Sequence, residues 1–198
     1  MTEQALSWAL WIVAAYFAGA VPFGFLIGRM RGVDVRTVGS KNIGATNVYR
    51  TVGKKWGLLA FLCDFLKGFV PTLAAAKCAG CGGDLPVVVG LACVIGHTLT
   101  VFMKFKGGKG VATAFGMMVA LIPYLALGVL ALFIVTVWLS HYISLGSCLA
   151  AAALGIAVWF CGCPLSLKVV VTLIAVFVIV KHKSNIKRLI NGCENRIY

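Results

Sequence analysis

The stretch from residue 111 to residue 180 contains one formally charged side chain, that of Lys168. A helix needs about 20 apolar residues to cross the hydrocarbon core of a bilayer, so this stretch can hold three long or four short membrane-spanning helices. The whole chain is 61% hydrophobic and 12% charged, whereas soluble domains carry about 25% charged residues. Because 198 residues cannot bury so much apolar surface, we predict an all-α, polytopic integral membrane protein.

The charges of the connecting segments decide how many helices follow residue 111. Short basic loops stay on the cytoplasmic side of a membrane, and four helices would put the basic tail on the same side as the earlier basic loops. The sequence therefore predicts about seven transmembrane helices, with the N-terminus outside and the C-terminus cytoplasmic. The three earlier spans are expected at residues 5–28, 56–76 and 85–103, and breaks in the later stretch at Pro123, 141–144 and 161–164.

The net charge of +13 would suggest nucleic acid as the partner of a soluble protein. Here the cations lie in short loops beside apolar spans, a pattern typical of membrane orientation and of anionic substrates near the surface. We therefore expect no nucleic-acid partner. No long polar segment is present to build a second domain, so residues 1–198 are predicted to form a single domain. The first apolar run is expected to be a retained helix, because the basic cluster follows it.

The eight cysteines lie mostly in apolar stretches, where cysteine behaves as a small hydrophobic residue. Cys78 and Cys81 form a CxxC pair, but no second pair or histidine stands at zinc-ligand spacing, so we expect no metal site. A disulfide between this loop and Cys161 or Cys163 is an open alternative if both loops face an oxidising compartment.

The first of three polar segments covers residues 38–50. Glycines let backbone N–H groups approach a ligand closely, and short polar side chains with an arginine suit phosphate oxygens. An ordinary cytoplasmic turn is the alternative, although such a turn needs only lysine and arginine. The candidate substrate-binding residues here are Ser40, Asn42, Thr46, Asn47 and Arg50.

The second polar segment covers residues 96–113 and ends in a glycine loop before an apolar helix. Such a loop makes an anion site from backbone N–H groups and the helix dipole, and it is not a Walker A loop, because Gly110 follows Lys109. His97 is either a substrate contact or a packed interior histidine. The candidates in the loop are Lys104, Lys106, Gly107, Gly108 and Lys109.

The third polar segment covers residues 180–194. His182 and Asn185 stand three positions apart, so one helical face can present an imidazole beside an amide; a basic juxtamembrane helix on anionic lipid is the alternative. Ser144 and Ser147 lie at the predicted inner turn between the fifth and sixth spans. They either line the same pocket or belong to an ordinary break between helices.

Asp64 and Lys67 lie inside the second predicted span. Charges within a membrane are costly and tend to be paired or functional, and we favour a structural ion pair over a direct substrate contact. The inner loops hold only Asp34 and Glu194 as acids, and the chain lacks both a Gly-x-Ser-x-Gly elbow and a His-x4-Asp acyltransferase motif. An inner face with many cations and amides but few bases suits two phosphate-bearing substrates whose own groups supply the reactivity.

Taken together, the three segments resemble one known set of motifs. Gly-Ser-x-Asn-x-Gly-Ala-Thr-Asn, Gly-His-x4-Phe-x2-Phe-Lys-Gly-Gly-Lys-Gly-Val-Ala-Thr and His-x2-Asn-Ile-x-Arg-Leu are similar to those of the bacterial acyl-phosphate:glycerol-3-phosphate acyltransferases. The resemblance covers nearly the whole chain in order. In one departure, Lys41 stands where the first motif usually has glycine, which leaves the loop's conformation there open.

This resemblance implies a seven-helix enzyme of the bacterial inner membrane, with its active site on the cytoplasmic face. It would transfer a fatty acyl group from acyl phosphate to the 1-hydroxyl of sn-glycerol 3-phosphate, giving lysophosphatidic acid and phosphate, the first acylation step of phospholipid synthesis. We expect no cofactor, contact with membrane lipid, and a functional link to the enzyme that makes acyl phosphate. Carried over by position, Ser40, His182 and Asn185 are the catalytic candidates, and Arg50 and Lys109 bind phosphate.

Two other functions are possible for a polytopic membrane protein of this composition. A membrane transporter of an anionic phospho-metabolite predicts polar residues at mid-bilayer in several spans, whereas the polar groups here gather at one interface. A membrane anchor would not need three loops rich in glycine and amides. The sequence leaves open whether the acyl group passes through an acyl-enzyme or directly to glycerol phosphate; we favour direct transfer, with His182 or a substrate phosphate oxygen as the base.

Overall fold

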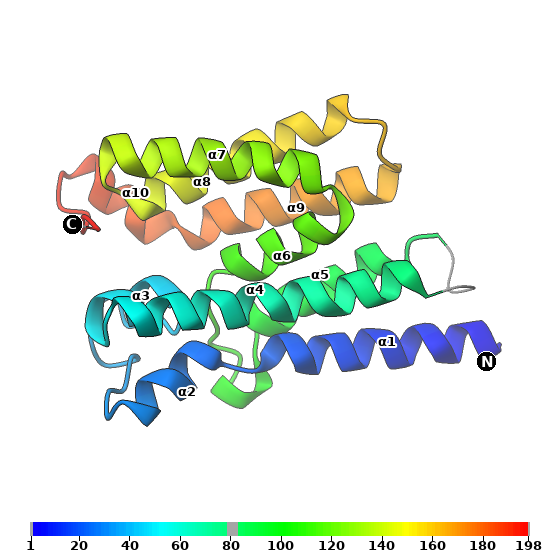
Figure 1. Cartoon of the computed structure of the whole chain (residues 1–198), viewed down its shortest axis with the longest axis horizontal. Helices are drawn as coiled ribbons and strands as arrows, with labels where there is room; N and C mark the ends of the chain where they lie inside the picture. Colours follow the sequence, from blue (N-terminus) through cyan, green and yellow to red (C-terminus); the bar gives the residue numbers. More distant parts are fainter. Residues whose placement is uncertain (1, 79–82, 198) are drawn as a thin grey trace. The chain divides into compact units, whose positions relative to one another are not determined.

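The computed structural model describes residues 2–78 and 83–197, and every regular element within them is a helix. This confirms the predicted all-α class for the part of the chain described. The chain divides into two compact units, Met1–Leu121 and Ile122–Tyr198 (Figure 1).

The first unit is built around three long helices. Helix α4 packs against α1, α5 and α6, and α1 also packs along α5 (Figure 1). The short helices α2 and α3 follow the first span and carry the first polar loop. The elements are α1 (Glu3–Ala20), α2 (Phe23–Met30), α3 (Ala45–Thr51), α4 (Lys54–Lys77), α5 (Leu85–Thr98), the 3₁₀ turn η1 (Val101–Met103) and α6 (Val111–Leu121).

Glycines bring the helices of the first unit into close contact. A Cβ atom added to Gly19 or Gly96 would overlap the facing backbone at the α1–α5 contact, and one added to Gly68 or Gly116 would do so at the α4–α6 contact. Small residues at such contacts let helices in a membrane gain van der Waals packing that lipid cannot provide. These contacts hold the loops at the ends of α4, α5 and α6 in fixed positions.

The second unit is a row of three helices with a short fourth. Helix α8 packs against α7 and α9, and the tail after α10 returns to the turn before α8, where the Ile197 N–H donates to the His141 carbonyl at 2.9 Å. The elements are α7 (Pro123–Ser140), α8 (Ile143–Ala157), the 3₁₀ turn η2 (Val158–Phe160), α9 (Leu165–Lys181) and α10 (Lys183–Ile190).

The number of spans is smaller than the sequence predicts, when judged by length and composition. Among the described residues, five helical segments can cross a membrane, and a sixth is the α9–α10 pair, bent by 54°. Between residues 111 and 181 lie four α-helices, α6 to α9, with breaks at the predicted places. The first of them, α6, has only 11 residues, or about 16 Å at 1.5 Å per residue, against a hydrocarbon core about 30 Å thick. Seven full-length spans are therefore not confirmed.

Candidate functional site

Asn47 organises the first polar loop. Its side-chain amide donates to the carbonyls of Val35 (2.8 Å) and Val38 (3.2 Å), and its Oδ1 accepts from the Ser40 N–H (2.9 Å). The side chain is 1% exposed. Since both amide hydrogens hold the loop itself, this geometry favours a role for Asn47 in loop shape over contact with substrate.

The tip of this loop is exposed and turns sharply. Gly39 has φ +59° and Lys41 has φ +57°, a left-handed conformation that glycine adopts readily and other residues rarely. The departure at Lys41 thus falls on a position whose backbone suits the glycine of the usual motif. Between these two residues, Ser40 lies on the surface.

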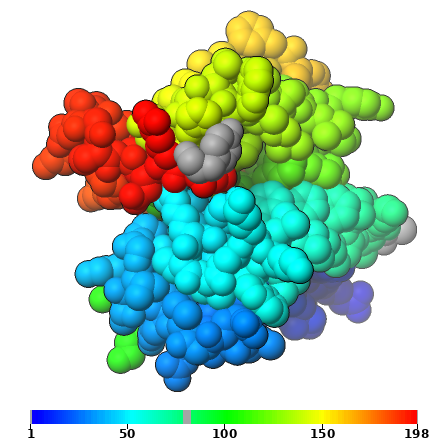
Figure 2. All heavy atoms as spheres, turned by 60° about the vertical axis from the view of Figure 1, so that its left-hand side comes forward, coloured from blue at the N-terminus to red at the C-terminus, as the bar shows by residue number. Residues whose placement is uncertain are grey.

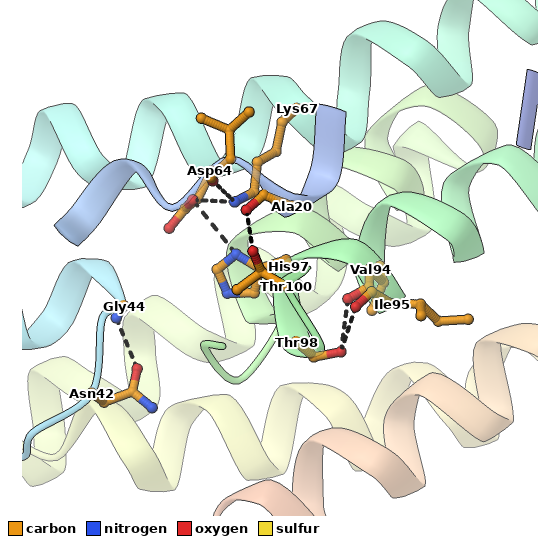
Figure 3. Close-up of polar contacts among 11 residues, drawn as sticks. Ala20, Asn42, Gly44, Asp64, Lys67, Val94, Ile95, His97, Thr98 and Thr100 are labelled. Atoms are coloured by element: carbon orange, nitrogen blue, oxygen red, sulfur yellow. Dashed lines mark hydrogen bonds and ion pairs between the residues drawn. The ribbon is translucent and has the colours of Figure 1, made fainter. Parts of the chain in front are cut away.

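The remaining candidates of the first segment lie at and beyond the start of α3. The Oδ1 atom of Asn42 accepts from the Gly44 N–H at 2.8 Å and closes a tight turn (Figure 3). Thr46 follows in the first turn of α3, and Arg50 is half-buried in its last turn. Helix α3 lies beside α2 on one face of the first unit, cyan beside blue in Figure 2.

The N–H groups of the second loop are largely occupied. Gly107 donates to the Thr98 carbonyl, Gly108 to the His97 carbonyl and Lys106 to the Met103 carbonyl, each at 3.1 Å. A Cβ on either glycine would overlap this backbone or the His97 ring. The glycines therefore let the loop pack against the end of α5, and an anion site from backbone N–H groups would rely on residues after Gly108 and on the first turn of α6.

The three lysines of the second loop differ in exposure. Lys104 and Lys106 are exposed, whereas Lys109 is half-buried just before α6. Met103 packs on the same apolar cluster as Ile43 and Val48 of the first segment. The two segments of the first unit therefore share one supporting core.

His97 lies in a buried polar cluster with the two intramembrane charges (Figure 3). The predicted ion pair is present, with Lys67 Nζ 2.8 Å from Asp64 Oδ1. The same carboxylate oxygen is 3.5 Å from His97 Nδ1, and the His97 side chain is 5% exposed. This burial agrees with the interior-histidine alternative, while a direct substrate contact stays a prediction.

Glu194, which is not among the site candidates from the sequence, is the centre of the second unit's polar network. One oxygen accepts from Asn185 Nδ2 (2.7 Å) and Ser144 Oγ (2.9 Å), and the other accepts from Arg188 Nε (2.7 Å). Burial by itself raises the pKa of this carboxyl, but these hydrogen bonds outweigh it and hold the pKa below its usual range. The one signal in the sequence was an isolated acid in a strongly basic tail.

His182 stands at the bend between α9 and α10 and is 3% exposed. Its Nδ1 lies 2.7 Å from the Val178 carbonyl, which can only accept. The neutral ring therefore carries its proton on Nδ1, and Nε2 is the atom able to accept one. Ser147 is also buried, but its hydroxyl donates to the Ile143 carbonyl of its own helix at 2.9 Å.

The two acids of the predicted inner loops are both engaged. The Asp34 carboxylate binds the Arg36 guanidinium through two contacts of 2.7 and 2.9 Å, and this pairing lowers its pKa to about 2. Glu194 is held by the network described above. Neither carboxylate is placed as a general base for a hydroxyl group.

The described residues test only some of the predictions about the cysteines. Cys81 lies outside the described residues, so neither the CxxC pair nor its disulfide to the later loop is tested. Cys161 and Cys163 carry free thiols. Among the residues that the structure describes, no three histidine, cysteine or acidic side chains are grouped to hold a metal ion.

The chain is similar to known proteins over nearly its whole length. The glycerol-3-phosphate acyltransferase family model matches residues 9–192. A glycerol-3-phosphate acyltransferase of Trichlorobacter lovleyi is 50% identical over 186 residues, covering 94% of this chain and 95% of the relative. That of Geobacter sulfurreducens is 50% identical over 182 residues, covering 92% and 93%.

Solved structures agree with the sequence relatives. The crystal structure of PlsY (YgiH), an integral membrane glycerol 3-phosphate acyltransferase, in its glycerol 3-phosphate form matches with a TM-score of 0.92 and 41% identity, over 96% of this chain and 95% of that one. Its lysophosphatidic acid form matches with a TM-score of 0.89 and 40% identity, over the same shares of the two chains. The chain is an integral membrane protein that belongs to the glycerol-3-phosphate acyltransferase family.

Proposed function

We propose that this protein transfers a fatty acyl group from acyl phosphate to the 1-hydroxyl of sn-glycerol 3-phosphate, giving lysophosphatidic acid and phosphate. The observation that carries the proposal is the 41% identity, along 96% of the chain, to an enzyme crystallised in a glycerol 3-phosphate form. The absence of a His-x4-Asp motif supports acyl phosphate as the donor, because that donor already carries a good leaving group. The enzyme that makes acyl phosphate is then its functional partner.

In the proposed reaction the 1-hydroxyl oxygen attacks the acyl carbon directly. The bond from the acyl carbon to the phosphate oxygen breaks, and inorganic phosphate leaves with the electron pair. The hydroxyl proton passes to His182 Nε2 or to a phosphate oxygen of a substrate. The carboxylates of Asp34 and Glu194 are held in ion pairs with arginines, which supports this choice of base. Holding both substrates together lowers the barrier by several kcal/mol through proximity.

The proposed roles follow the position of each residue within its own unit. In the first unit, half-buried Arg50 and Lys109 bind phosphate, exposed Ser40 contacts the reacting groups, and Asn42, Thr46, Lys104 and Lys106 line the approach. In the second unit, Glu194 holds Asn185 and Ser144 in place, and Asn185 donates a hydrogen bond to substrate beside His182.

The proposed topology keeps seven crossings in one domain of the inner membrane, with the N-terminus outside and the site on the cytoplasmic face. The crossing that length does not support would be made by α6 together with the loop before it. Irregular backbone is tolerated at membrane depth where its polar groups are satisfied by protein. The carbonyl partners of the Gly107 and Gly108 N–H groups support this assignment.

Purified protein tests the proposed function directly. Palmitoyl phosphate and glycerol 3-phosphate should yield lysophosphatidate and phosphate in equal amounts. Arg50→Ala and Lys109→Ala should each lose more than about 2 kcal/mol of transition-state stabilisation, because each removes a charge-assisted contact, whereas exposed Lys55→Ala should not. An acyl-enzyme trapped with acyl phosphate alone and seen by intact mass would refute direct transfer.

A further inference from the structure

The buried cluster of Asp64, Lys67 and His97 contacts backbone atoms at the break between α1 and α2 and in the second polar loop. Asp64 and Lys67 have side chains that are 3% and 4% exposed. Intramembrane charges are retained where they are paired or functional. An ion pair within one helix turn would satisfy itself, yet this pair makes contacts on two other elements (Figure 3).

The first contact is at the break between α1 and α2. Lys67 Nζ donates to the Val21 carbonyl at 2.8 Å, and the Thr100 hydroxyl donates to the Ala20 carbonyl at 2.6 Å. These carbonyls lie just before Pro22, which has no N–H to continue the helix. The break is thereby fixed from α4 and from the segment after α5, and α2 leads from it into the first polar loop.

The second contact is under the glycine loop. The His97 carbonyl accepts from the Gly108 N–H at 3.1 Å, and the ring Nε2 lies against the Cα of Gly108, where a Cβ would overlap it. The opposite ring nitrogen, Nδ1, faces Asp64 at 3.5 Å. A rotation of this ring would therefore both leave Asp64 and disturb the loop that leads to Lys109.

We propose that Asp64 is a positioning residue for phosphate binding. Charge-balanced by Lys67, it fixes the His97 ring, and the ring supports residues 104–110 in the conformation that presents Lys109 to a substrate phosphate. This inference rests on the proposed function for the identity of the substrate. The competing explanation is that the ion pair only stabilises helix packing.

A charge-neutral double variant separates the two explanations. Asp64→Asn and Lys67→Met alone each leave a buried charge without its partner and should lower the thermal midpoint, whereas the double variant removes both charges and should regain most of the loss. If Asp64 acts through His97, the double variant should still show a KM for a phosphate substrate raised about tenfold or more. His97→Gln should raise the same KM, and adding it to the double variant should add little, because the residues act as one unit.

Thr72→Val is the matched control, since its buried hydroxyl bonds only within α4, to the Gly68 carbonyl at 2.7 Å; it should leave both KM values unchanged. Hydrogen exchange of the peptide covering residues 104–110 gives a second readout that does not need activity, and the double variant should exchange faster there than wild type. A double variant with wild-type KM values and wild-type exchange would overturn the proposal. A wild-type protein without transferase activity would instead overturn the proposed function, and exchange alone would then decide the role of Asp64.

Discussion

At Lys41 the backbone takes a left-handed conformation, φ +57°, that costs an L-residue about 1–2 kcal/mol. Replacing it with glycine should relieve this strain, partly offset by the greater freedom of glycine in the unfolded chain. We predict that Lys41→Gly keeps its activity and gains about 0.5 kcal/mol, measured as the thermal midpoint in detergent. Lys55→Gly, in helix α4, should lose stability instead; equal losses in both variants would show that the loop is not strained at Lys41.

The lowered pKa of Glu194 makes the stability of the folded protein depend on pH. Its pKa in the folded protein lies below the ordinary value of 4.5, because hydrogen bonds from Asn185, Arg188 and Ser144 outweigh the effect of burial. The stability that it contributes is thus fully present above that ordinary value, and it is lost as the pH falls through the lowered folded pKa. Glu194→Gln should cost about 2–4 kcal/mol near pH 7, because it breaks a buried charged network.

The thermal midpoints of wild type and Glu194→Gln should converge as the pH is lowered below about 4.5. Lys187→Gln, on the same short helix, serves as the control and should follow wild type throughout. A gap between wild type and Glu194→Gln that stays constant down to acid pH would contradict the assigned charge state.

At the scale of helices, the sequence predicted the breaks better than the lengths. Pro123 begins α7, and α9 begins directly after Pro164, because proline suits the first turn of a helix and disrupts its interior. The shortness of α6 follows from the start of the apolar run at Val111 and the predicted break at Pro123; the charge pattern, from which seven spans are predicted, takes no account of the length of α6. Its start is set by the Gly110 turn, φ +84°, and by tertiary contacts of the loop.

For the candidate site, too, the sequence predicted some features and not others. The polar segments are recognisable as motifs, but the partners of Asn47 and the role of Glu194 depend on turns of the chain that bring together residues 6 to 50 positions apart. Likewise, nothing local indicates that the Gly107 and Gly108 N–H groups donate to carbonyls at the end of α5. The residue types indicate groups suited to binding phosphate, whereas tertiary contacts decide which groups hold the loops.

The α4–α6 contact provides a test of helix packing. A Cβ on Gly116 would overlap the backbone at Phe65, so Gly116→Val should force the helices apart and cost about 1–3 kcal/mol. The matched control is Gly128→Val, since apart from the adjacent residues and the nearby backbone of its own helix no atom lies within 4 Å of the position of its added Cβ. The comparison is made by thermal unfolding in detergent, and similar midpoints for the two variants would argue against the described contact.

At the scale of the whole molecule, the orientation in the membrane is the main proposal. Cysteines introduced at the exposed positions Lys41, Lys106 and Asn191 should be protected from an impermeant reagent in spheroplasts, and those at Glu3 and Asp84 should be labelled. The native cysteines are replaced by alanine or serine first, and lysed cells give the maximal labelling. Labelling of Asn191 in intact spheroplasts would contradict the proposed seven crossings with both the site and the tail inside.

The central claim is that the glycerol phosphate hydroxyl attacks the acyl carbon of acyl phosphate. Glycerol 3-phosphate carrying ¹⁸O in its 1-hydroxyl distinguishes attack at the acyl carbon from attack at phosphorus, because the attacking oxygen stays in the product. With palmitoyl phosphate and purified protein, mass spectrometry should find the ¹⁸O in the ester oxygen of lysophosphatidate and none in the released phosphate. Labelled glycerol bisphosphate with free fatty acid, which marks attack at phosphorus, or the absence of labelled lysophosphatidate would contradict the account.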